Sequence, residues 1–269
     1  MLPSLVATDL DGTFLSTNGH PSQRNVRAVL HAAERAVPVV VATGRPARWL
    51  QCLDPVRPAH PWVLASNGAV VYDLAEDRIV HSYPVPADEC LDVALAMRRR
   101  CEDIHFGVEY GIGWGREPGC PLRGDRVEAD LVGPLELLVT RPFVKLLVSS
   151  TVHSSDELAE MLLELCTDRL TCTWSIGGPI GLLEVSALGV TKAHTLQLVA
   201  EELGVPLADA VAFGDMPNDL AMLHAVGHGY AMADAHPLLV QAGFRRAPGH
   251  DESGVGQVLE ELLGITSSE

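Results

Sequence analysis

Acidic side chains gather at two places in this chain, and each group directly follows a short apolar run. The first lies in residues 9–13 (Asp-Leu-Asp-Gly-Thr) and the second in residues 214–219 (Gly-Asp-Met-Pro-Asn-Asp). Such apolar runs are typical of buried parallel strands, so both groups are expected where strands end, the edge at which open α/β sheets bind ligands. Converging carboxylates repel one another unless a hard cation neutralises them. The pattern therefore indicates a Mg²⁺ site and phosphate chemistry.

The first acidic group offers two carboxylates with separate tasks. Asp9 and Asp11 are two residues apart, and if the chain turns at Gly12 both reach the same cavity. One carboxylate could attack phosphorus to give an aspartyl phosphate. The other could protonate the leaving oxygen and later deprotonate a water molecule.

Further polar residues provide candidates for holding the phosphate. Thr43 and Gly44 end a second predicted strand, and with a short helix expected from about residue 46 they form a generic phosphate cradle. Taken alone, this short motif is weak.

A lysine and an amide complete the candidate set. Lys192 lies in the first turn of a predicted helix, where a cation is unfavourable, which indicates a use such as holding a phosphoryl oxygen. Asp215 and Asp219 would complete the metal site, and Asn218 could donate a hydrogen bond to phosphate. Each residue alone is more often a surface residue or a helix start. Their joint placement at four predicted strand ends or helix starts favours the functional interpretation.

The elements that must position these residues alternate between strand and helix on both sides of a different middle segment. The alternation predicts a Rossmann-like α/β core, a parallel sheet with helices on both faces, formed by residues 1–82 and 186–269. Residues 83–185 are predicted to be a separate α+β module inserted into this core. Strands are expected at residues 5–9, 37–42, 62–65, 70–72, 79–81, 105–114, 143–149, 170–176, 181–185, 210–215 and 229–232, and helices at residues 22–35, 87–101, 154–166, 191–204, after 217 and at 253–263.

Composition limits the partners. With 19 Lys and Arg against 35 Asp and Glu, the net charge is −16 and the isoelectric point is near 5.0, which argues against nucleic acid or an anionic membrane. The six cysteines lack zinc-like spacing and indicate free thiols in a reducing cytosol. None of the eleven histidines is expected to bind metal, because none has a second ligand at helical spacing. Without a signal-like or membrane-spanning segment, we expect a soluble cytoplasmic protein, either monomer or dimer.

The motifs resemble those of the haloacid dehalogenase (HAD) superfamily, and among its members the Cof-type subfamily, whose large α/β cap is inserted between the second and third motifs. Residues 9–13 resemble motif one, residues 43–45 (Thr-Gly-Arg) motif two, Lys192 motif three and residues 214–219 motif four; residues 66–69 and 251–255 are also similar. Ala193 stands where the subfamily usually has glycine.

This resemblance implies a Mg²⁺-dependent phosphatase, a phosphoric monoester hydrolase. Asp9 would be the nucleophile and a metal ligand, Asp11 the general acid/base and a ligand through its backbone carbonyl, and Asp215 the third ligand. Asp219 would orient a metal-bound water. The phosphate would be held by the Leu10 backbone, Thr43, Gly44, Lys192 and Asn218.

The resemblance also suggests the substrate class, a small phosphomonoester such as a sugar phosphate or a related metabolite or cofactor phosphate. Arg45 and Asn67 are candidate substrate contacts. The resemblance implies that residues 83–185 are the cap and determine substrate specificity. The candidates there are His105, Glu109, Tyr110, Trp114, Arg116, Lys145 and Glu184, although each such residue is more often a surface or packing residue.

Two other classes of function stay open. A phosphosugar mutase would share the aspartyl phosphate but return it to a sugar. A non-catalytic protein that binds phosphometabolites would lack a nucleophile, acid, lysine or metal aspartate, and none of these is missing. A two-component receiver domain is also acidic and Mg²⁺-dependent, but it would have about 120 residues and no inserted module, so the length of 269 residues argues against that class.

Overall fold

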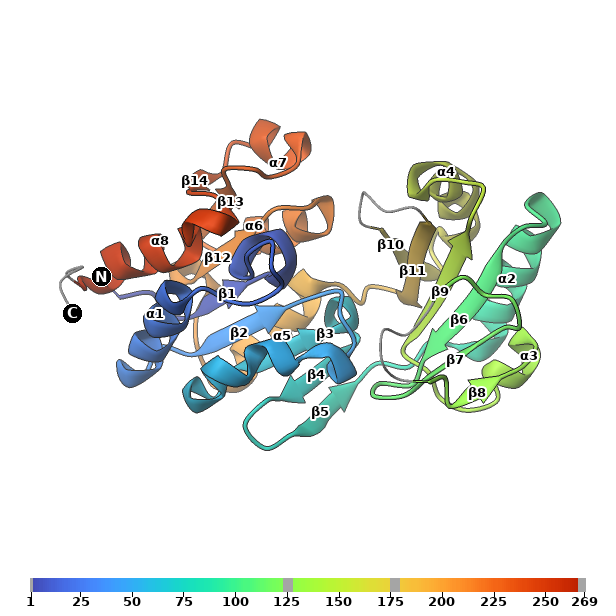
Figure 1. Ribbon diagram of the computed structural model, residues 1–269, viewed down its shortest axis with the longest axis horizontal. Coiled ribbons are helices and arrows are strands. Elements are labelled where there is room, and N and C mark those ends of the chain that lie inside the picture. Colours follow the sequence, from blue (N-terminus) through green and yellow to red (C-terminus); the bar gives the residue numbers. More distant parts are fainter. Residues whose placement is uncertain (1, 123–127, 175–179, 266–269) are drawn as a thin grey trace. The chain divides into compact units, whose positions relative to one another are not determined.

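A computed structural model of the chain describes residues 2–122, 128–174 and 180–265. It divides into two compact units (Figure 1). The first comprises Met1–Arg45, Trp49–His81 and Lys192–Glu269, and the second Pro46–Arg48 and Ser82–Thr191. Residues 46–48, 82 and 186–191, which the sequence placed in the core, thus belong to the second unit.

The first unit is built on an eight-stranded sheet of order β14-β13-β12-β1-β2-β3-β4-β5. The neighbours from β14 to β3 pair in parallel, and β4 pairs antiparallel with β3. The strands are β1 (Val6–Thr8), β2 (Val39–Ala42), β3 (Trp62–Ala65), β4 (Val70–Asp73), β5 (Arg78–Ser82), β12 (Val211–Gly214), β13 (His228–Met232) and β14 (Arg245–Ala247). Strands β1, β2 and β12 are buried throughout, which explains their uninterrupted apolar sequence.

Helices cover this sheet in two layers, in which α1 packs with α8 and α5 packs with α6. The helices are α1 (Gln23–Glu34), α5 (Lys192–Leu203), α6 (Leu220–Ala225), α7 (Pro237–Gln241) and α8 (Gly254–Leu263). Ser22 caps α1 as expected, because its side chain accepts from the Asn25 amide. The predicted α/β core is therefore confirmed, although β14 and α7 were not expected.

The second unit has a six-stranded sheet of order β10-β11-β9-β6-β7-β8, antiparallel except for the β7–β8 pair. Its strands are β6 (His105–Glu109), β7 (Trp114–Arg116), β8 (Leu131–Val132), β9 (Lys145–Ser150), β10 (Leu170–Thr173) and β11 (Gly181–Ala187), and its helices α2 (Ala87–Arg100), α3 (Leu135–Leu138) and α4 (Ser155–Cys166). This confirms the expected α+β insertion.

The differences from expectation in the second unit have local causes. The single strand expected at 105–114 is two, because the chain reverses near Gly111, which has a φ of 95°. The expected strand at 170–176 ends at Thr173, and residues 175–176, like the tail 266–269, lie outside the described residues.

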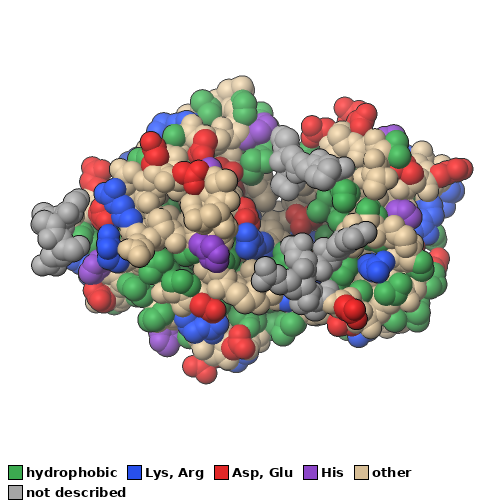
Figure 2. Space-filling model, viewed as in Figure 1, with side chains coloured by type: hydrophobic (Ala, Val, Ile, Leu, Met, Phe, Trp, Pro, Cys, Tyr) green, Lys and Arg blue, Asp and Glu red, His purple; other side chains and the backbone are tan. Residues whose placement is uncertain are grey.

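The described residues contain no helix long and apolar enough to cross a membrane. On the visible face, acidic and basic side chains are interspersed (Figure 2).

Candidate active site

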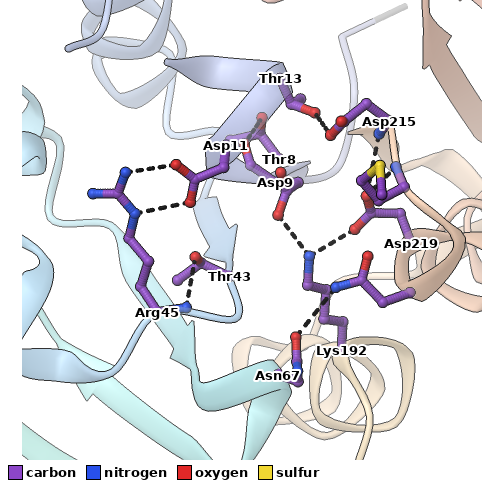
Figure 3. Close-up of polar contacts among 12 residues, drawn as sticks. Thr8, Asp9, Asp11, Thr13, Thr43, Arg45, Asn67, Lys192, Asp215 and Asp219 are labelled. Carbon is purple, nitrogen blue, oxygen red and sulfur yellow. Dashed lines mark hydrogen bonds and ion pairs between the residues drawn. The ribbon is translucent and has the colours of Figure 1, made fainter. Parts of the chain in front are cut away.

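A buried lysine joins the two acidic groups. Lys192, the first residue of α5 and 2 % exposed, places its Nζ 2.6 Å from Asp9 Oδ1 and 2.7 Å from Asp219 Oδ1 (Figure 3). Asp9 directly follows β1, and its amide donates to the Phe213 carbonyl in β12. Adjacent parallel strands thus carry the two acidic groups to one edge of the sheet.

A glycine allows the two acidic groups to pack closely. Gly12 has a φ of 76°, and a Cβ added there would lie 2.4 Å from Asp215 Oδ2. The next residue, Thr13, donates from its hydroxyl to Asp215 Oδ1 at 2.8 Å. Only glycine satisfies both the left-handed backbone and the lack of space, so the turn after β1 is fixed against Asp215.

Among the described residues, the site contains three carboxylates but only one ammonium group, that of Lys192, to neutralise them. Burial, together with the charges of Asp219 and Asp215, raises the pKa of Asp9 well above its usual value, although Lys192 opposes this. Burial and Asp219 likewise raise the pKa of Asp215 to about 6, against the opposing effects of Thr13 and Lys192. Burial alone would lower the pKa of Lys192, but the charges of Asp219 and Asp9 outweigh it and raise that pKa.

This donor set fits a divalent cation. Carboxylate oxygens of Asp9, Asp215 and Asp219 lie within 4.8 Å of one another. Three carboxylates and one ammonium leave two formal negative charges, which one Mg²⁺ would balance, and oxygen ligands suit that ion. Asp219 is already engaged on both oxygens, by Lys192 and by the amides of Asp215 and Met216.

The second carboxylate of the first motif has a different partner. The side chain of Asp11 is 59 % exposed and forms a bidentate ion pair with Arg45, at 2.5 Å from Nη2 and 2.8 Å from Nε. It turns toward Arg45 whereas Asp9 turns toward Lys192 (Figure 3). The two carboxylates, expected in the same cavity, thus have separate partners here.

The loops after β2 and β3 support each other. The Thr43 hydroxyl accepts from the Arg45 amide, and the Thr43 carbonyl accepts from the Asn67 amide. Ser66 and Asn67 are both buried with positive φ angles, a strained conformation that is common at functional sites. The short helix expected from about residue 46 is present as two 3₁₀ segments, Ala47–Trp49 and Gln51–Ala59. The second contains Pro55 and Pro58, which disfavour a regular α-helix there.

An amide pair lies beside these loops. Asn218 Nδ2 donates to Asn67 Oδ1 at 3.3 Å, while Asn218 Oδ1 is buried and has no hydrogen-bond partner among the residues described. A buried polar atom left in this way is unusual and is consistent with a ligand position.

Sequence reasoning missed two supporting threonines. Thr13 was part of the first motif but had no assigned task. Thr195 donates to the Gly68 carbonyl at 2.9 Å and so fastens the loop after β3 to α5. Its spacing of three from Lys192 on one helix face was the available signal.

Three of the cap candidates come together within the second unit. Lys145 is 1 % exposed, and its Nζ lies 2.5 Å from Glu184 Oε1 and 3.9 Å from Glu109 Oε2. Glu109 also pairs with Arg48 at 3.4 Å, a residue that the sequence did not single out. We call these four residues the ion-pair cluster.

The other cap candidates have contacts that serve packing. Tyr110 donates to the Leu138 carbonyl and lies under Arg141, Trp114 lies under Arg48, and Arg116 donates to the Glu117 carbonyl. His105 accepts from Ser149 through its carbonyl.

The sequence profile of the haloacid dehalogenase-like hydrolases matches residues 6–259. The chain belongs to this family. It is 25 % identical over 292 residues to the phosphatase YwpJ of Bacillus subtilis, covering 96 % of this chain and 99 % of that protein. It is 28 % identical over 240 residues to the HMP-PP phosphatase of Shigella flexneri, covering 87 % and 86 %. The solved structure of the HAD subclass IIB sugar phosphatase BT4131 superposes with a TM-score of 0.81 at 19 % identity, covering 98 % and 100 %.

These findings confirm the resemblance to Cof-type HAD proteins and the expected enzyme class, phosphoric monoester hydrolase. The roles of individual residues rest on the geometry above.

The charge imbalance predicts an unusual stability profile for Asp215→Asn. Because the folded-state pKa of Asp215 is raised to about 6, its contribution to stability is present below pH 4 and is lost as the pH rises through 6. In EDTA at pH 7, Asp215→Asn should therefore be more stable than wild type, by up to about 3 kcal/mol. The difference should vanish near pH 4.

Urea unfolding at both pH values measures this difference. Saturating Mg²⁺ should stabilise wild type more than the variant at pH 7. A variant less stable than wild type in EDTA at pH 7 would contradict the charge excess.

Proposed function

We propose that this protein is a Mg²⁺-dependent phosphatase that hydrolyses small phosphomonoesters through an aspartyl phosphate on Asp9. The observation that carries this proposal is the buried Asp9 carboxylate, held by Lys192 among three converging aspartates. The named phosphatases among the relatives support it.

Asp9 acts as the nucleophile. An oxygen of its carboxylate forms a bond to phosphorus while the bond between phosphorus and the leaving oxygen breaks. Lys192 orients Asp9 through the 2.6 Å hydrogen bond and carries a positive charge that can bind a phosphoryl oxygen. Water then attacks phosphorus, releases phosphate and regenerates Asp9.

Asp11 acts as the general acid and base. It gives a proton to the leaving oxygen and takes one from the attacking water. Its exposed carboxylate is accessible to solvent protons, and its bidentate pair with Arg45 makes Arg45 a positioning residue for it. Arg45 could also contact the substrate, as the sequence suggested.

The phosphate-binding groups are the Leu10 backbone, Thr43, Gly44, Lys192 and Asn218. Asn67 and Asn218 support this assignment because their amides pair beside the strained loop. The Nδ2 group of Asn218 is the atom that would donate to a phosphate oxygen, whereas its partnerless Oδ1 could accept only from a donor such as a substrate hydroxyl or a water molecule.

Asp9, Asp215 and the Asp11 backbone carbonyl would hold Mg²⁺. The ion would neutralise charge on the transferring phosphoryl group. Asp219 serves mainly by holding Lys192 and the backbone after β12, since both of its oxygens are engaged.

The substrate is proposed to be a small phosphorylated metabolite, as the HMP-PP and sugar phosphatases among the relatives suggest. We further propose that the ion-pair cluster of the second unit recognises the part of the substrate other than phosphate. Buried ion pairs add little net stability compared with apolar packing, so a cluster of four charged residues favours a role in recognition. Cytoplasmic localisation and the absence of nucleic-acid or membrane partners remain predictions.

Asp9→Asn should abolish phosphate release from a panel of sugar, nucleotide and cofactor phosphates, which wild type should hydrolyse with Mg²⁺ but not with EDTA. Asp209→Asn, an exposed aspartate of the same unit, is the matched control and should retain activity. Turnover by Asp9→Asn near the wild-type rate would refute the nucleophile. No release by folded wild type would favour a mutase or a binding protein.

Asp11→Asn should slow esters with poor leaving groups most. An alkyl phosphate needs protonation of its leaving oxygen, whereas p-nitrophenolate leaves without it, so the rate should fall by about 10²–10⁴-fold for the alkyl ester. The loss for p-nitrophenyl phosphate should be clearly smaller. Equal losses for the two substrates would contradict the acid role.

Glu184→Gln should raise the KM for the best panel substrate by roughly tenfold or more. The substitution removes the charge of the carboxylate and so weakens the hydrogen bond that we propose Glu184 makes with the substrate. The kcat/KM for p-nitrophenyl phosphate should change far less, since this ester lacks the natural leaving group. Glu136→Gln, on α3 of the same unit, serves as the control. An equal effect on both substrates would show that the ion-pair cluster acts only in folding.

A further inference from the structure

Three side chains of different metal-binding types meet in the second unit, away from the ion-pair cluster. Cys101 and Asp103 lie in the connection between α2 and β6, and His153 lies in the connection between β9 and α4. No sequence pattern indicated this group, because the histidine lies far along the chain from the other two residues.

The three ligand atoms are already close enough to share an ion. Cys101 Sγ lies 2.8 Å from Asp103 Oδ1, which lies 3.5 Å from His153 Nε2, and all three atoms fall within 4.8 Å of one another. Zinc takes sulfur at about 2.3 Å and nitrogen or oxygen at about 2.0–2.2 Å, so its ligand atoms stand roughly 3–4 Å apart. Small side-chain adjustments would therefore complete the geometry.

A buried serine holds two of the ligands in place. Ser150, at the end of β9, donates from its hydroxyl to Asp103 Oδ2. The same hydroxyl accepts from the amides of Val152 and His153 at 3.0 and 2.9 Å. The hydrogen bond to Asp103 orients a ligand carboxylate, as such bonds do in metal sites, while the bond to the His153 amide fixes the backbone of that residue.

The group is closed on one side and open on the other. Cys101 is only 5 % exposed, whereas the side chains of Asp103 and His153 are 31 % and 34 % exposed. An ion could thus enter from solvent and keep a water molecule as its fourth ligand.

A catalytic cysteine is a weaker interpretation. The Cys101 thiol donates its hydrogen bond to Asp103, and His153 contacts the same carboxylate on its Nε2 side. The imidazole is therefore not placed between thiol and carboxylate, as a cysteine–histidine nucleophile requires.

We propose that Cys101, Asp103 and His153 bind Zn²⁺, at a site distinct from the aspartate cluster of the first unit. Sulfur and imidazole ligands select zinc over magnesium. Binding replaces the thiol proton, which is released to solvent, so a thiolate, a carboxylate and a neutral imidazole balance the ion's charge. The ion links the α2–β6 connection to the β9–α4 connection and stabilises the second unit. This inference does not depend on the proposed phosphatase activity.

Co²⁺ titration of the metal-stripped full-length protein tests the site, because a thiolate ligand gives cobalt a charge-transfer absorption that carboxylates do not. Wild type should show this absorption at one equivalent, Zn²⁺ should remove it, and excess Mg²⁺ should not. Asp9→Asn should retain it. Cys101→Ser should abolish it, whereas Cys172→Ser, a half-buried cysteine of the same unit, should not.

His153→Gln provides a second test in a variant that should fold normally, since the side chain of His153 is partly exposed. It should weaken Co²⁺ binding at least about tenfold, in the range found when metal-site residues are lost, and remove the zinc-induced rise in Tm that wild type shows in saturating Mg²⁺. Its Mg²⁺-dependent phosphate release should be unchanged. Absence of the absorption in wild type, its persistence in Cys101→Ser, or unchanged affinity in His153→Gln would overturn the proposal.

Discussion

The buried ammonium of Lys192 is the interaction on which the rest of the site depends. It bonds Asp9 after β1 and Asp219 after β12, so one charge fixes the ends of two neighbouring strands. Removing one partner of such a buried pair typically costs about 3–5 kcal/mol, because the other charge is left uncompensated. The lysine must therefore sit at the start of α5, although a cation there opposes the helix dipole. Local helix stability is outweighed by the charge of the site.

The same charge balance accounts for the different environments of the two aspartates of the first motif. Asp9 is buried in an acidic environment that a single lysine cannot neutralise, which suits a group that works beside a cation. Asp11 turns outward to Arg45, and its side chain is 59 % exposed to solvent. The two-residue spacing, with Gly12 packed against Asp215, thus gives the two carboxylates separate environments, as the proposed roles of nucleophile and acid require.

The second unit shows a different use of buried polarity. One face of its sheet packs on α2 and α4 with apolar side chains such as Phe106, Leu146 and Leu183, while alternation along the same strands places Glu109, Lys145 and Glu184 on the other face. Buried ion pairs of this kind add little net stability compared with apolar packing, which is why we propose that the ion-pair cluster serves recognition.

The sequence by itself determined the parallel core, the inserted α+β segment and the acidic motifs, because strand and helix periodicity and motif spacing are local properties. The sequence also identified Asp9, Lys192, Asp215 and Asp219 as candidate site residues, because they lie at predicted strand ends and at a predicted helix start. Only the tertiary structure decided that Arg45 pairs with Asp11, that Arg48 joins the ion-pair cluster, and that His153 meets Cys101 and Asp103. These pairs come from connections that meet only once the sheets have formed, and no periodic pattern in the chain records such a meeting.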